Sequence, residues 1–152
     1  MVPFHAEAIA VGDCAVLRIT GEIDVYTAPD LRQQVIQLAG DGTRHIVGDL
    51  RGVDFLDSTG LGVLVGSLKR LRLLQGSLKL VTGDGRVLQL FTITGLSRAF
   101  ELHPSVLDAI SGDPHWQAAL AGERPAAENH AAGNHFARDH GAGEWCRKHK
   151  LP

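Results

Sequence analysis

Short apolar segments alternate with segments of helical periodicity along most of this 152-residue chain, and this alternation limits the folds open to it. The strand-like segments span residues 7–11, 14–20, 45–50, 78–82 and 99–102. Apolar residues recur at helical spacing in residues 28–39, 58–75, 86–94, 105–110 and 113–120. Strands that alternate with helices pair in parallel, whereas Gly12-Asp13 between the first two strands predicts a tight hairpin. We therefore expect an α/β fold with a mixed, mostly parallel β-sheet, an N-terminal hairpin and flanking helices.

The overall charge and composition argue against several classes of function. Hydrophobic residues make up 44%, charged residues 21%, and the formal net charge is −2, as in an ordinary globular domain. A nucleic-acid-binding domain would carry a basic stripe, and a membrane span would need about 18 uninterrupted apolar residues. The first ten residues lack the basic start of a signal peptide, and Cys14 and Cys146 form no motif. We expect a cytoplasmic protein with neither nucleic acid nor membrane as a partner.

The periodic pattern ends near Gly122, which suggests a folded domain over residues 1–121. Residues 122–152 are rich in Ala, Gly, Asn and His and predict a disordered tail. Histidines five residues apart would turn by about 140° per step on a helix and share no face, and no zinc-like spacing is present. We therefore expect no metal site among the histidines and cysteine of this tail: His130, His135, His140, His149 and Cys146.

The segment DFLDSTGLGVLVG, residues 54–66, places Ser58 where an apolar run meets the start of a helix. One interpretation is a nucleotide-binding turn. The glycines follow the pattern G-x-G-x-x-x-G, however, so the third comes one residue too late for the dinucleotide fingerprint, and no G-K-[ST] follows. Small residues that let the helix pack closely on the sheet are the favoured explanation of this pattern.

A second interpretation makes Ser58 a catalytic nucleophile. The nucleophile elbow needs G-x-S-x-G, and the glycine before Ser58 is absent. A triad also needs a histidine base. His45 opens a strand at the end far from Ser58, and His103 follows the last predicted strand. The third interpretation is a serine that another enzyme modifies, with Ser58 also serving as the N-cap of its helix.

Three sequence segments resemble those of a known family: GEIDVYTAPDLR (residues 21–32), DFLDSTGLGVLVGSLKR (54–70) and FTITGLSRAFELHPSVLDAI (91–110). In order and spacing they resemble anti-sigma factor antagonists of the STAS domain family, most of all those of actinobacterial type. The resemblance covers about residues 8–110. It implies a binding module, not an enzyme, and no cofactor.

The resemblance also implies a mechanism and a set of site residues. The unphosphorylated antagonist binds an anti-sigma factor that is also a serine kinase, and this releases the sigma factor. Phosphorylation of the serine that aligns with Ser58 ends the binding, and a metal-dependent phosphatase restores it. The implied partner-binding residues are Asp24, Asp57, Ser58, Thr59, Gly60 and Leu61, with Thr59 as the second candidate phosphoacceptor. The alternative is a STAS scaffold or ligand-sensing module within a larger signalling complex.

Overall fold

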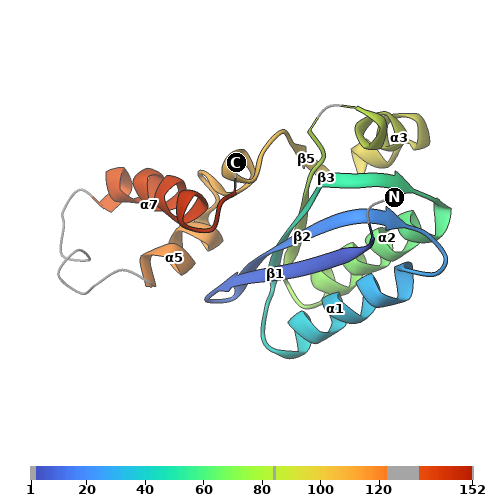
Figure 1. The fold of residues 1–152 in the computed structure, drawn as a ribbon. Coiled ribbons are helices and arrows are strands. Elements are labelled where there is room, and N and C mark those ends of the chain that lie inside the picture. The colour runs from blue at the N-terminus through green and yellow to red at the C-terminus, as the bar shows by residue number, and fades with distance from the viewer. Residues whose placement is uncertain (1–2, 84, 123–133, 152) are drawn as a thin grey trace.

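The structure is a computed structural model that describes residues 3–83, 85–122 and 134–151. Its five strands lie side by side in chain order (Figure 1): β1 (His5–Val11), β2 (Cys14–Ile23), β3 (His45–Leu56), β4 (Ser77–Val81) and β5 (Glu101–His103). The helices are α1 (Ala28–Gly40), α2 (Ser58–Leu73), α3 (Arg86–Thr94), α4 (Val106–Ile110), α5 (Pro114–Gly122) and α7 (Asn134–Lys148), with a short 3-10 turn, η1 (Leu96–Arg98), after α3.

The pairing of the strands confirms the predicted fold class. β1 and β2 form an antiparallel hairpin in which Val11 pairs with Cys14, and Gly12 turns the chain with a φ of +57°. The pairs β2–β3, β3–β4 and β4–β5 are parallel. The sheet is therefore mixed and mostly parallel, with the hairpin at one edge.

Two central strands run further than the sequence predicts. β2 continues to Ile23, beyond the predicted end at residue 20, and β3 continues to Leu56, beyond the predicted end at residue 50. The two strands pair along this extension, which ends with Ile23 opposite Leu56 and includes a register shift between Gly21 and Glu22. Pairing with a neighbour decides strand length here, because β-propensity depends strongly on context. As a result, the loops after β2 and β3 begin level with each other.

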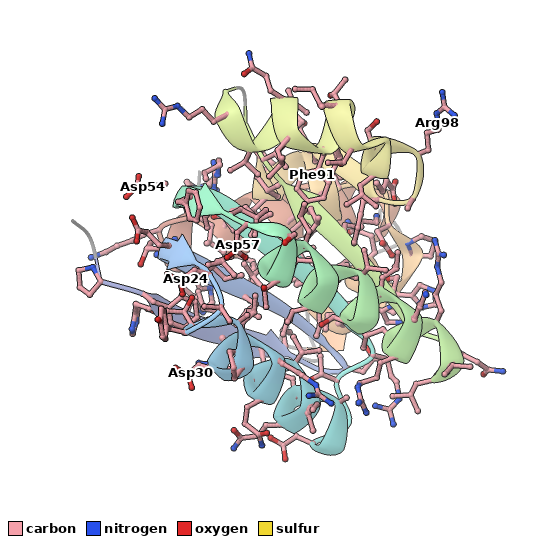
Figure 2. The ribbon with its side chains drawn as sticks, turned by 90° about the vertical axis from the view of Figure 1, so that its right-hand side faces the viewer. Asp24, Asp30, Asp54, Asp57, Phe91 and Arg98 are labelled. Carbon is pink, nitrogen blue, oxygen red and sulfur yellow. The ribbon has the colours of Figure 1, made fainter. Side chains whose placement is uncertain are left out.

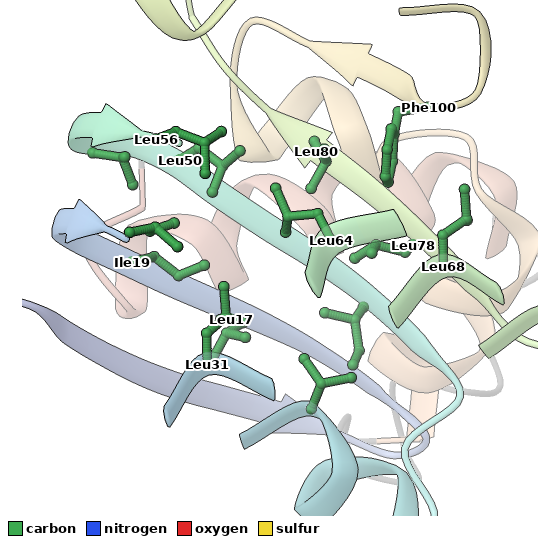
Figure 3. Packing of buried hydrophobic residues seen from close by; sticks show 14 of the residues in the cluster. Leu17, Ile19, Leu31, Leu50, Leu56, Leu64, Leu68, Leu78, Leu80 and Phe100 are labelled. Carbon is green, nitrogen blue, oxygen red and sulfur yellow. The ribbon is translucent and has the colours of Figure 1, made fainter. Parts of the chain in front are cut away.

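One apolar core lies between the sheet and helices α1, α2 and α3 (Figure 3). On β2, Leu17 and Ile19 point into this core, because alternate residues of a strand share a face. Leu31 of α1 and Leu64 of α2 pack against them. This packing fixes α1 and α2 side by side, with their N-termini at the carboxyl edge of the sheet.

A second core covers the opposite face of the sheet and corrects the prediction for the C-terminal segment. Val16 of β2 and Val47 of β3 pack there with Trp116 of α5 and Trp145 of α7, whose rings meet edge to face at 5.5 Å. Cys146 and Leu151 are also buried. The prediction of disorder is therefore wrong for residues 134–151, because a few large apolar side chains are enough to hold α7 against α4 and α5. Residues 123–133 and 152, including His130, lie outside the described residues.

Candidate functional site

The site predicted around Ser58 forms where β2 and β3 end. The backbone N–H of Asp57 donates a hydrogen bond to the carbonyl oxygen of Ile23 at 3.1 Å, which joins the two strand ends. Asp24 follows Ile23 directly, and Figure 2 shows Asp24 and Asp57 on the same side of the molecule. The carboxyl ends of parallel strands are the usual place for function in an open α/β sheet. The structure thus brings together the two acids that the sequence analysis singled out.

Asp57, not Ser58, is the N-cap of α2. Its backbone is extended (φ −98°, ψ −176°), and its Oδ1 accepts a hydrogen bond from the N–H of Gly60 at 2.9 Å. Ser58 is the first residue of the helix. The prediction that Ser58 caps the helix is wrong because β3 continues to Leu56, which puts Asp57 at the extended position that a cap requires, and aspartate caps as well as serine. The hydroxyl of Ser58 is consequently left exposed and free of a capping role.

The start of α2 has spare hydrogen-bond donors beside Ser58. The first four N–H groups of a helix have no partner within it. Here the N–H of Gly60 is bonded to the Asp57 carboxylate and that of Leu61 to the Asp57 carbonyl, at 2.9 Å each. The amides of Ser58 and Thr59 are therefore left to face the surface, at the positive end of the helix dipole. A dianionic group at this point would find both donors and a favourable field.

Asp24 orders the loop that leads into α1. Its Oδ1 accepts hydrogen bonds from the backbone N–H groups of Tyr26 (2.9 Å) and Thr27 (3.0 Å). Thr27 occupies the N-cap position of α1, but its hydroxyl makes no capping bond and instead donates to the carbonyl of Glu22 at 2.8 Å. Asp24 thus serves as a loop-capping carboxylate.

The other predicted site residues divide between surface and packing. Thr59 is exposed next to Ser58, whereas Leu61 is half-buried and packs against the core. Gly60 is buried, and a Cβ added to it would lie 2.6 Å from Leu56 Cδ1 and 2.7 Å from Ile23 Cγ2. Gly60 is therefore a packing residue that lets α2 sit close on the sheet.

Sequence reasoning missed three apolar side chains that flank the site. Val25 is 57% exposed, Tyr26 is 85% exposed and Phe55 is 49% exposed. Val25 and Tyr26 follow Asp24 in the chain, and Phe55 is the second-last residue of β3, two residues before Asp57. Exposed aromatic side chains are enriched in protein interfaces. The signal in the sequence was the apolar pair Val25-Tyr26 between two polar loop residues, which a folding argument alone does not explain.

The geometry disfavours the catalytic interpretation of Ser58. His45 opens β3, and Ser58 follows its other end, on the order of 40 Å away at about 3.3 Å per residue. His103 is level with Asp49 of β3 through Val81 of β4, well short of Leu56. Neither histidine can serve Ser58 as a base.

Metal binding and membrane insertion also find no support in the described part of the chain. There, no cluster of three or more histidine, cysteine or acidic side chains has the arrangement of a metal site. No helix in residues 3–83, 85–122 or 134–151 combines the length and apolarity that crossing a bilayer requires. Cys14 and Cys146 are both free and buried.

Comparison with known proteins agrees with the fold and the motifs. The model of the STAS domain family matches residues 5–109. Over 86 residues, or 57% of this chain and 78% of the relative, the sequence is 44% identical to the anti-sigma-B factor antagonist of Bacillus subtilis (strain 168). A crystal structure of an anti-sigma factor antagonist from Mycobacterium paratuberculosis matches with a TM-score of 0.66 and 28% identity, covering 72% of this chain and 92% of that one.

A third match shows the fold alone. The Bacillus cell fate determinant SpoIIAA in its phosphorylated form aligns with a TM-score of 0.56 and 21% identity, over 71% of this chain and 96% of that one. The family model, the sequence identity and the strand order agree with one another. The chain belongs to the STAS domain family, as its three sequence blocks indicated.

Proposed function

We propose that this protein is an anti-sigma factor antagonist whose unphosphorylated form binds an anti-sigma factor with serine kinase activity and so releases a sigma factor. Phosphorylation of Ser58 then switches the binding off. The observation that carries this proposal is the exposed Ser58 at the first position of α2, beside free amides and directly after Asp57, at the strand ends where Asp24 also lies. The names of its relatives, which are antagonists of anti-sigma factors, support the same function.

The protein performs no chemistry in this account. The kinase transfers the γ-phosphoryl group of ATP to the Ser58 oxygen, ADP leaves, and the hydroxyl proton passes to a base of the kinase. A metal-dependent phosphatase hydrolyses the phosphoserine and regenerates the hydroxyl. Because these partners act on transcription, we place the protein in the bacterial cytoplasm.

A phosphate on Ser58 should leave the fold intact. It adds about −1.5 to −2 charges at neutral pH, and a negative group at a helix N-terminus gains about 0.3–1 kcal/mol. The Ser58 and Thr59 amides are positioned to receive it. Asp57 already caps the helix through Gly60, so the phosphate displaces no existing hydrogen bond of the Ser58 side chain.

The same phosphate should disrupt the partner surface. Asp24, Asp57 and the exposed Asp54 and Asp30 lie on this side of the molecule (Figure 2), so a dianion adds to existing negative charge. A charge left unpaired in an interface weakens binding by about 2–5 kcal/mol. The loss in the interface exceeds the gain at the helix end, and the protein can be reused once the phosphate is removed.

The experiment that tests this proposal uses purified anti-sigma kinases from the source organism, each incubated with ATP and the full-length protein. One kinase should add about 80 Da to the wild type and to Thr59→Ala, but nothing to Ser58→Ala. Ser58→Ala should bind that kinase with ATP present, and Ser58→Asp should not bind. Phosphate mapped to Thr59, or full binding by Ser58→Asp, would assign the switch elsewhere.

A further inference from the structure

A groove lies between α1 and α2. Along α2 its lining extends from Thr59, next to Ser58, to Arg70 near the end of the helix. Its volume is about 300 Å³, and its floor and walls include the apolar side chains of Val35, Ile36 and Val63. Ile36 and Val63 are only half-buried, so apolar surface in the groove is open to solvent. The residues that α2 contributes recur at steps of three and four, which is one face of the helix.

The groove begins directly behind the phosphoacceptor. Ser58, Gly62, Gly66 and Arg70 follow one another at intervals of four residues, so they form one row along α2. This row spans about 18 Å at 1.5 Å per residue. Gly62, Gly66 and Arg70 therefore line the groove on the same helix that presents Ser58. A partner bound at Ser58 would also contact the groove.

The two glycines of this row are not required by the fold. A Cβ added to Gly62 or to Gly66 would meet no atom within 4 Å, in contrast to Gly60, whose added Cβ would clash with Ile23 and Leu56. The interpretation of these glycines as close packing on the sheet is therefore wrong for Gly62 and Gly66. Glycine lowers the stability of a helix interior, so packing within the chain gives no reason for its presence at either position. What the glycines do is keep the groove open.

The groove carries a positive charge toward each of its two ends. Arg32 of α1 and Arg70 of α2 line it, and both are exposed. Arg32 lies in the second turn of α1, at the same end as Ser58, and Arg70 lies in the last turn of α2. An occupant that matches this surface has an apolar face for the groove and acidic side chains placed to meet the two arginines.

We propose that this groove docks an amphipathic helix of the anti-sigma kinase, with its apolar face in the groove and acidic residues against Arg32 and Arg70. This inference rests on the proposed function and extends the partner surface about three turns along α2. A helix laid in a groove, with anchors at helical spacing, is a common mode of recognition. Continuity with Ser58 favours the kinase over a second copy of this chain as the occupant.

The first test fills the groove without touching the phosphosite. Gly66→Leu and Gly62→Leu should each weaken binding of the kinase that phosphorylates Ser58 by at least about tenfold, measured by calorimetry with purified proteins. Gly40→Leu is the matched control, because Gly40 ends α1 outside the groove and its added Cβ also meets no atom within 4 Å. Gly40→Leu should bind within about twofold of wild type, and urea unfolding should show every variant folded.

The second test reverses charge and does not depend on how a leucine is accommodated. Arg70→Glu should weaken binding at least about tenfold, and the loss should shrink at high salt. Lys69→Glu carries the same charge change one residue away, outside the groove lining, and should have little effect. If Gly66→Leu does not fold, Arg70→Glu against Lys69→Glu decides the question.

Failure of the groove and failure of the proposed function give different results. Wild-type affinity in Gly66→Leu and Arg70→Glu, with binding lost in Ser58→Asp, would overturn the groove and leave the function standing. Absence of both binding and Ser58 phosphorylation in the wild type would reject the function and the groove together. A wild-type dimer in sedimentation that Gly66→Leu dissociates would make a second copy the occupant and overturn our assignment.

Discussion

The backbone N–H of Asp57 is hydrogen-bonded to the carbonyl oxygen of Ile23 at 3.1 Å, so the helix that carries Ser58 starts against the end of the neighbouring strand. The Asp57 carboxylate then caps that helix through Gly60. Asp57 therefore both fixes the point at which α2 begins and caps that helix. Ser58 is held in place by its neighbour and contributes no capping bond of its own.

Replacement of the cap should be measurable as lost stability. Asp57→Ala removes the acceptor of the Gly60 N–H and should lower the free energy of unfolding by about 1 kcal/mol. Asp57→Asn keeps a capping oxygen and should remain near wild type, because asparagine is an equally good cap. Urea unfolding of the three proteins checks this. Equal stability of Asp57→Ala and wild type would show that the cap is not important to α2.

Two glycines of α2 should respond to alanine in opposite directions. Gly60→Ala places a Cβ within 3.1 Å of the Ile23 carbonyl oxygen and closer still to two side chains, so it should destabilise by about 1–3 kcal/mol. Gly66→Ala meets open space and should stabilise by about 0.5–1 kcal/mol, because alanine is the better helix residue. Thermal or urea unfolding distinguishes them, and a loss of stability in Gly66→Ala would mean that the position is packed.

The C-terminal helix should contribute to global stability. Trp145 is 5% exposed and packs against Trp116, so Trp145→Ala should lower the free energy of unfolding by about 3–5 kcal/mol. Glu144→Ala, at the exposed neighbouring position, is the matched control and should change stability by less than about 0.5 kcal/mol. If Trp145→Ala unfolds like wild type, α7 does not pack against α4 and α5 in solution.

The stability of the protein should fall on mild acidification because of His45. Burial lowers the pKa of His45 below its ordinary value, and the charge of His115, whose ring stacks on it at 3.8 Å, lowers the pKa further. Lys79 acts in the same direction, and Asp13 and Asp113 oppose it without reversing it. His45 in the unfolded chain therefore binds a proton near pH 6.5, whereas His45 in the folded chain binds it only at lower pH.

The sign of this effect follows from the lowered pKa. The contribution of neutral, buried His45 to the free energy of unfolding is complete above about pH 7. It is lost as the pH falls through 6.5 toward the folded-state pKa, by at most about 1.4 kcal/mol per pH unit. Urea midpoints at a series of pH values from about 7.5 to 5.5 should fall more steeply for wild type than for His45→Gln. Parallel curves for the two proteins would exclude His45 as the cause.

The order of elements was predictable from sequence because apolar periodicity is local. The hairpin at Gly12 and the helix after Ser58 both depend on neighbours in the chain. The assignment of the cap was not predictable, since Asp57 and Ser58 are equally good capping residues and only the pairing of Leu56 with Ile23 decides between them.

Features that depend on distant contacts were missed for a physical reason. Trp145 stabilises α7 because it packs against Trp116 in the second core. The sequence around residue 145 gives no indication of this distant contact. The groove likewise exists only because α1 packs beside α2, which gives Gly66 and Arg32 a shared surface. Local patterns describe the elements, whereas these two features arise from how the elements are assembled.

The most direct measurement compares the protein phosphorylated on Ser58 with the unmodified protein, in the same buffer, for both folding and binding. The phosphorylated form should unfold at an equal or slightly higher urea concentration and should bind the anti-sigma kinase at least about 30-fold more weakly. A phosphorylated sample that binds with undiminished affinity, or that loses binding only because it has unfolded, would contradict the switch proposed for Ser58.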